Sequence, residues 1–223
     1  MSKIVLIIAV HPDDETLGCG GTIQKHKDKG DRVYWLILTQ ANQRVTNIPK
    51  IVEQQARYVN QVSLEYNFDG WAQFQFLTTE LDKYPFGEIV NQISKHIKRI
   101  KPQIIYFNHF ADVHSDHKVA FDAIWASTKN FKFPYIDKIL LFETLSETEF
   151  SPAVLKNAFS PNVFNDITPF MEKKLEIMKL FTTEQQDEHY PRALSSIRAL
   201  ARYRGSRIGV KYAEAFMLIL ERT

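Results

Sequence analysis

Short, almost wholly apolar runs alternate along this chain with segments whose apolar residues recur at helical spacing. Apolar runs of this length, bounded by polar residues, are typical of strands buried on both faces of a sheet. The runs that predict strands are 3–10, 32–38, 73–77, 103–107, 139–143 and, more weakly, 163–167. The segments that predict helices are 20–29, 49–66, 86–100, 115–128, 168–182 and 192–203, and 213–220 completes the chain.

This order of elements indicates the fold class. Strands separated by helices of roughly 10–15 residues form βαβ units, which place the strands in a mostly parallel sheet. We therefore predict a Rossmann-like α/β fold of three layers, with the last third of the chain added as helices and a strand. No linker rich in Pro, Gly or Ser divides the sequence, so a single domain over 1–223 is expected.

Composition excludes several classes of protein. The 223 residues carry 28 basic and 26 acidic side chains, and the net charge of +2 argues against nucleic acid as a partner. A single cysteine excludes a disulfide framework and any cysteine-rich metal site. The apolar run at 4–10 is too short for a membrane span, which needs about 20 residues, and no small-residue cleavage site follows it. We expect a cytoplasmic enzyme without a membrane span.

Two acidic, histidine-containing segments follow predicted strands. Residues 11–15 (HPDDE) come directly after the first strand, and residues 108–117 (NHFADVHSDH) follow the strand at 103–107. In a doubly wound sheet the crevice lies beyond the carboxyl ends of the strands, where the strand order reverses. The first strand and the strand that opens the second half are neighbours at that point. Two segments about 100 residues apart are therefore expected to face each other across one crevice.

The residue types in these segments suggest a metal centre. Histidine and aspartate make a mixed nitrogen and oxygen ligand set that suits a divalent ion such as zinc. A catalytic zinc keeps an open position for water, and a nearby carboxylate takes the proton of that water. The two segments hold more carboxylates than a ligand set requires, namely Asp13, Asp14, Glu15, Asp112 and Asp116. This excess is what a metal with a neighbouring general base needs.

Each of these features also has a structural interpretation. The sequence His-Pro-Asp can form a simple turn, and Glu15 can merely complement a helix dipole. His109, which lies next to an aromatic residue, is interpreted as structural. The glycines at positions 18, 20 and 21 fail the dinucleotide-binding pattern because its third glycine falls at Ile23. We interpret them instead as positions where a helix packs closely on the sheet.

The motifs resemble those of a known family. Segments 9–22 (AVHPDDETLGCGGT) and 112–117 (DVHSDH) are similar to the first and second motifs of the LmbE-like, or PIG-L, zinc-dependent N-deacetylases. The resemblance continues through 142–149, 161–164, 204–205 and 212–216, and so covers nearly the whole chain. It implies an enzyme that removes the acetyl group from an N-acetylglucosamine-type sugar. The later motifs look most like a bacterial branch of surface-polysaccharide and sugar-nucleotide pathways, which implies a nucleotide-linked sugar as one substrate candidate.

The resemblance also implies residue roles. The metal ligands that it implies are His11, Asp14 and His117. The metal would be Zn²⁺, although these ligand types also suit other divalent ions. Asp13 would be the general base. His114 would stabilise the oxyanion or protonate the leaving amine, with Asp116 hydrogen-bonded behind it.

Substrate contacts are less sharply indicated. Some relatives have Tyr where this chain has Asp112. Many relatives have Arg where this chain has Lys50, and Arg44 is a candidate to replace that missing arginine. A basic run interleaved with tyrosines at 198–212 suggests recognition of a phosphorylated or nucleotide-linked substrate, or else a solvated helix face or an oligomer contact. The candidate contacts are Arg44, Asp112, Glu147, Asn162 and Arg204.

Two further function classes remain open at this point. A few members of the family hydrate a small unsaturated acid with the same metal and water, so a hydratase is the alternative enzyme. A non-catalytic binding module stabilised by its metal is the alternative outside enzymes. Relatives of this size are commonly homo-oligomers, so the resemblance also implies a homo-oligomer.

Overall fold

A seven-stranded sheet forms the centre of the protein in a computed structural model that describes residues 2–44 and 50–223. The strands lie in the order β3-β2-β1-β4-β5-β7-β6. Their bounds are β1 (Ile4–Ala9), β2 (Arg32–Gln40), β3 (Gly70–Leu77), β4 (Ile104–Asn108), β5 (Lys138–Phe142), β6 (Val163–Asp166) and β7 (Ala213–Glu221). Strands β1 to β5 pair in parallel, and β7 runs antiparallel to both β5 and β6. The predicted mostly parallel sheet is thus confirmed.

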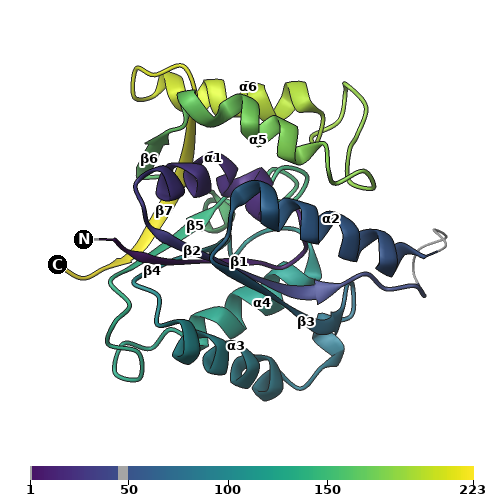
Figure 1. The fold of residues 1–223 in the computed structure, drawn as a ribbon, viewed down its shortest axis with the longest axis vertical. Helices are drawn as coiled ribbons and strands as arrows, with labels where there is room; N and C mark the ends of the chain where they lie inside the picture. Colours follow the sequence, from purple (N-terminus) through teal and green to yellow (C-terminus); the bar gives the residue numbers. More distant parts are fainter. Residues whose placement is uncertain (1, 45–49) are drawn as a thin grey trace.

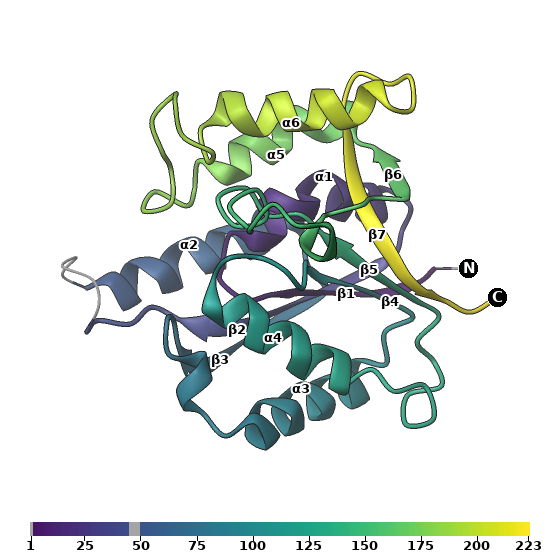
Figure 2. The same cartoon turned by 180° about the vertical axis from the view of Figure 1, so that it is seen from behind.

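Helices cover both faces of the sheet (Figure 1). Their bounds are α1 (Asp14–Asp28), α2 (Ile51–Tyr66), α3 (Phe86–Ile100), α4 (Ser115–Ala126), α5 (Met171–Met178) and α6 (Leu194–Ser206). Helices α1 and α2 lie on one face, with α5 and α6 beyond them, and α3 and α4 lie on the other (Figures 1 and 2). The predicted three-layer α/β fold is therefore confirmed.

The alternation of side chains along β1 explains the two cores. Val5, Ile7 and Ala9 belong to the core beneath α1, α2, α5 and α6. Leu6 and Ile8 belong to the core beneath α3 and α4. Because successive side chains of a strand point to opposite faces, an apolar run without interruption is what a central strand with two covered faces requires.

Helix α1 begins six residues earlier than its apolar pattern indicates and contains a kink. It starts at Asp14, where the backbone N–H groups of Thr16 and Leu17 both bond to the carbonyl of Asp13 at 2.9 Å. The buried polar side chains of this first turn hide the helix from a search for apolar periodicity. The backbone at Cys19, with φ −144° and ψ 22°, then interrupts the helix.

The glycines around the kink are packing positions, as the sequence predicted. A Cβ at Gly18 would lie 2.1 Å from the ring of Phe142 on β5, and one at Gly21 would lie 2.6 Å from Ile167. A Cβ at Gly20 would meet the hydroxyl of Tyr66 at 2.5 Å. A Cβ at any of these separations would force its neighbour to move, so all three positions favour glycine for close packing.

A buried ion pair satisfies the backbone groups that the kink leaves free. Glu214 on β7 accepts hydrogen bonds from the N–H groups of Gly21 (2.9 Å) and Thr22 (2.7 Å). Lys174 on α5 donates to the carbonyl of Leu17 at 2.9 Å and to Glu214 at 2.7 Å. The side chains of Lys174 and Glu214 are only 3% and 4% exposed. The last third of the chain is thereby joined to the helix that carries the first acidic motif.

The remaining differences from the predicted elements are small. The helix expected at 168–182 is a 3₁₀ turn at Thr168–Phe170 followed by the short α5, and residues 182–193 form a loop before α6. Strand β3 begins three residues before the predicted start. Position 49, expected to begin a helix, lies outside the described residues, and α2 is described from Ile51. None of the helices that the structure describes is long and apolar enough to cross a membrane.

Candidate metal centre and active site

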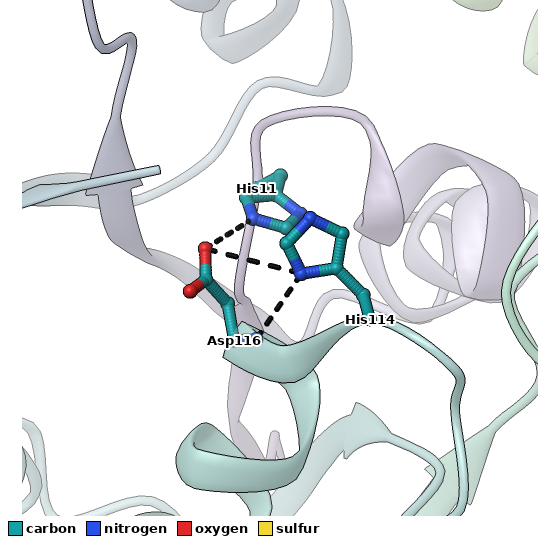
Figure 3. A group of neighbouring side chains, drawn as sticks. All are labelled: His11, His114 and Asp116. Atoms are coloured by element: carbon teal, nitrogen blue, oxygen red, sulfur yellow. Dashed lines mark hydrogen bonds and ion pairs between the residues drawn. The ribbon is translucent and has the colours of Figure 1, made fainter. Parts of the chain in front are cut away.

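The two acidic segments meet because β1 and β4 are adjacent parallel strands. Val5 pairs with Ile104 and Ile7 with Tyr106, so both strands end at the same edge of the sheet. His11 follows β1, whereas His114 and Asp116 lie at the start of α4, and Figure 3 shows these three side chains directed toward one another. The crevice that the topology rule predicts is therefore where the two motifs are found.

Three side chains place ligand atoms around one point. The nearest atoms of His11, Asp14 and His117 all lie within 4.8 Å of one another. Nδ1 of His11 is 3.2 Å from Nε2 of His117, which is in turn 3.5 Å from Oδ2 of Asp14. Two imidazole nitrogens and one carboxylate oxygen form the ligand set of many catalytic divalent-metal sites.

A carboxylate lies behind each histidine of this set. Oδ2 of Asp116 is 3.0 Å from Nε2 of His11, and Oδ2 of Asp112 is 2.8 Å from Nδ1 of His117. Each carboxylate therefore accepts the ring N–H that faces away from the ligand point, which fixes the tautomer and the ring orientation. The second oxygen of Asp112 accepts from the hydroxyl of Thr148 at 2.7 Å, so the whole carboxylate is engaged.

Asp116 thus has a different partner from the one that the resemblance implied. Its Oδ2 is 4.0 Å from Nδ1 of His114, too far for a hydrogen bond. Nδ1 of His114 instead accepts the backbone N–H of Asp116 at 3.1 Å and so caps helix α4. An accepting Nδ1 carries no proton, which leaves the proton on Nε2 of a neutral His114.

A second possible ligand group, His11 with His114 and Asp116, shares one histidine with the first. Both oxygens of Asp116 already accept backbone N–H groups, Oδ2 from Thr79 (2.7 Å) and Oδ1 from Leu81 (3.1 Å), which makes Asp116 less suited to a metal. The two backbone N–H groups that bond to Asp14 both go to its Oδ2. Nδ1 of His114 is also occupied by its helix cap. The group with Asp14 and His117 therefore fits a metal better.

The electrostatics of the ligand set call for a positive charge. Burial alone would lower the pKa of His117, but Asp14 and Asp112 raise that pKa to about 9. The site thus stabilises a cation at the position where the three ligand atoms converge. A bound divalent ion would meet the same need, so the donor set and its charge fit a divalent metal.

Asp13 lies beside the ligand set in an unusual backbone conformation. Its φ of 154° is uncommon for any residue other than glycine, and such strain costs about 1–3 kcal/mol. The residue is only 3% exposed. Burial raises the pKa of its carboxyl group, and the neighbouring Arg192 opposes that rise. A strained, buried carboxylate next to a metal site is the environment expected of a functional base.

The loop at 182–193 contributes two residues that sequence reasoning missed. Arg192 donates to Oδ2 of Asp13 at 3.0 Å and to Glu184 at 2.7 Å. Its Nε donates to the hydroxyl of Ser146 at 2.7 Å. The loop has no periodicity and no motif, and its contact with Asp13 spans 179 positions of sequence, so no local signal marks it.

A cavity of about 230 Å³ opens beside these residues. His11, Asp13 and His114 line its metal side. Its other charged lining residues are Glu147, Glu184 and Arg192, and its uncharged polar ones are Asn42, Gln55, Tyr58, Thr78 and Thr183. The cavity combines groups that hold a metal, a base and polar side chains able to bind hydroxyl groups.

Of the predicted substrate contacts, Glu147 lines this cavity and the other four do not. Asp112 is fully buried behind His117. The side chain of Arg44 is 77% exposed and lies 3.9 Å from Glu80. Arg204 forms two hydrogen bonds with Glu143, at 2.8 and 2.6 Å, beside a separate cavity. Oδ1 of Asn162 accepts from the backbone of β7 at 2.8 Å.

Comparisons with known proteins identify the family and its relatives. A family model described as PIG-L, GlcNAc-PI de-N-acetylase, matches residues 6–128. The diacetylchitobiose deacetylase of Thermococcus kodakarensis is 25% identical over 222 residues, which cover 97% of this chain and 83% of that protein.

Solved structures share the fold. The N,N'-diacetylchitobiose deacetylase from Pyrococcus horikoshii matches with a TM-score of 0.78 and 22% identity, over 98% of this chain and 84% of that one. The 4-carboxy-2-hydroxymuconate hydratase from Pseudomonas putida matches with a TM-score of 0.76 and 16% identity, over 99% of this chain and 98% of that one. One architecture therefore occurs in proteins named for two different reactions.

Proposed function

Because the chain belongs to the PIG-L family of de-N-acetylases, we propose that it hydrolyses the N-acetyl amide of an amino sugar at a zinc centre. The observation that carries the proposal is the meeting of His11, Asp14 and His117 around one point, with Asp13 beside them at the cavity. Water is the second substrate, and acetate and the free amine are the products. The relatives named for deacetylation of diacetylchitobiose support the choice of an N-acetylated sugar.

The protein's own residues account for the proton transfers. Zinc held by the three ligands would supply Lewis-acid chemistry. Asp13 is the base that takes a proton from the attacking water. Nε2–H of the neutral His114 donates a hydrogen bond that stabilises the oxyanion, and the proton that Asp13 took from the water passes to the leaving nitrogen. Asp112 keeps the ring of His117 oriented throughout the reaction, and Asp116 does the same for His11.

The charges of the cavity favour an uncharged or cationic sugar over a nucleotide-linked one. Three carboxylates, those of Asp13, Glu147 and Glu184, line it against the single guanidinium of Arg192. With the carboxylate of Asp14 they still outnumber the charges of Arg192 and a bound divalent ion, so a phosphate would gain no net attraction there. The basic residue expected to recognise phosphate, Arg204, is neutralised by Glu143 instead.

The test is an acetate-release assay on protein whose metal content has been measured. Free N-acetylated sugars, their oligomers and sugar nucleotides are compared at equal concentration. We expect release from the uncharged sugars, and an Asp13→Asn variant that keeps its metal and loses about 100- to 10,000-fold in kcat. His117→Ala should lose the metal. Asp122→Asn, an exposed change on α4, is the control and should behave as the original protein.

The outcomes separate the candidate reactions. Loss of about 42 Da from the sugar indicates deacetylation, whereas a gain of about 18 Da on a small unsaturated acid indicates hydration, the reaction named for one structural relative. Metal-loaded protein that releases no acetate from any sugar would contradict the proposal. Full activity in Asp13→Asn would contradict the role of the base.

A further inference from the structure

Arg192 is held in one position by partners from three segments of the chain. Its Nε donates to Ser146, and its Nη1 donates to Asp13 and to Glu184. Its Nη2 lies 3.5 Å from Oε1 of Glu147. The side chain is 18% exposed. Several charge-assisted hydrogen bonds from a planar guanidinium define its position and its orientation together.

This arrangement acts on one oxygen of the general base. Oδ2 of Asp13 accepts from Arg192 at 3.0 Å, while no hydrogen bond to Oδ1 is found among residues 2–44 and 50–223. A carboxylate held by one oxygen cannot rotate freely about its Cβ–Cγ bond. The other oxygen is therefore kept available in a fixed direction.

We propose that Arg192 is a positioning residue, which anchors Oδ2 of Asp13 so that Oδ1 is presented to the attacking water. Glu184 and Ser146 hold the guanidinium in place, so the loop at 182–193 sets the geometry of a base that lies at the other end of the chain. The inference rests on the proposed deacetylation and adds a residue to its mechanism. It concerns the direction of the carboxylate and not its protonation.

The proposal makes a specific kinetic prediction. Arg192→Gln should lower kcat by about 10- to 100-fold, because a base displaced by about 1 Å loses that much rate. KM should change little, since the guanidinium acts on the base and not on the sugar. Arg192→Lys should recover part of kcat because an ammonium reaches Asp13 without keeping the other contacts. Arg198→Gln, which removes an exposed pair with Glu172, is the matched control.

A double-mutant cycle with Asp13→Asn tests whether Arg192 acts through Asp13. If it does, Arg192→Gln lowers kcat in the original protein but not in the Asp13→Asn background. An equal loss in both backgrounds overturns the proposal, as does a raised KM with unchanged kcat, which would mark a substrate contact. A merely structural role would shift the urea midpoint and leave kcat of the folded variant unchanged, which also overturns it.

A crystal structure of Arg192→Gln gives a readout that does not need activity. The proposal expects the Asp13 carboxylate to rotate or to occupy two orientations, and an unchanged carboxylate overturns it. An inactive original protein would contradict the proposed function, whereas an active protein whose Arg192 variants keep full kcat would contradict this inference alone.

Discussion

Lys174 offers a direct test of how the last third of the chain stabilises the kinked helix. Lys174→Met keeps the length of the side chain and removes its ammonium group. Glu214 then remains buried, 4% exposed, without its 2.7 Å partner, and the carbonyl of Leu17 loses its donor. Removing one member of a buried ion pair costs about 3–5 kcal/mol. Part of that cost here comes from the Leu17 carbonyl, since a buried carbonyl left without a donor costs about 1–3 kcal/mol.

The expected loss is therefore about 4 kcal/mol of unfolding free energy, a large share of the roughly 5–15 kcal/mol of a typical domain. With a urea m value of about 2–3 kcal/mol per molar, the midpoint should fall by about 1.3–2 M. Urea titration followed by tryptophan fluorescence measures this shift. The melting temperature of the same variant should also fall below that of the original protein.

The neighbouring Lys173 provides the control. Its ammonium pairs with Glu65 at the surface, where the two side chains are 37% and 47% exposed, so Lys173→Met should cost under about 1 kcal/mol. The double variant Lys174→Met/Glu214→Gln should recover part of the loss, because no charge then remains buried without a partner. Equal midpoints for the Lys174 and Lys173 variants would refute the reasoning.

Three further predictions concern other parts of the fold. Gly20→Ala should cost about 1–3 kcal/mol because its methyl group meets Tyr66, whereas Gly87→Ala, with open space around it, should not destabilise α3; calorimetry compares the two. Asp13→Gly should raise the melting temperature by relieving a φ of 154° while abolishing acetate release, and a fall in melting temperature would contradict the strain argument. Burial lowers the pKa of His96 from 6.5 to about 4, so the unfolded chain binds its proton first and stability is lost as pH falls from 6.5 toward 4. His96→Leu should reduce this loss by up to about 3 kcal/mol, seen as urea midpoints that differ less between neutral pH and about pH 5.

The fold and the meeting of the two acidic motifs were predictable because their signals are local, whereas the family resemblance supplied the choice of His11, Asp14 and His117 as ligands. Apolar runs marked the strands, and the topology rule placed the ends of β1 and β4 side by side, as the sheet order shows. His11 and His117 lie in compact motifs directly after those strands, so their meeting required no knowledge of side-chain packing.

Contacts between distant segments were not predictable. Lys174 and Glu214 are charged residues on elements with ordinary patterns, and only the kink at Cys19 gives them buried partners. Arg192 lies in a loop whose path depends on how α5 and α6 pack. The partner of Asp116 likewise depends on the cap of α4, because Nδ1 of His114 is already used there.

The candidate ligands and the charged residues on the other side of the cavity come from two different parts of the fold. His11, Asp14 and His117 come from the parallel half of the sheet, whereas Glu147, Glu184 and Arg192 come from the segments added after β5. Surface loops tolerate insertion and exchange better than the elements they connect, here β1, α1, β4 and α4, which position the three candidate ligands. Exchanging the other residues of the loop at 182–193 between relatives, with Glu184 and Arg192 kept, is therefore a route to new sugar specificity at an unchanged ligand set.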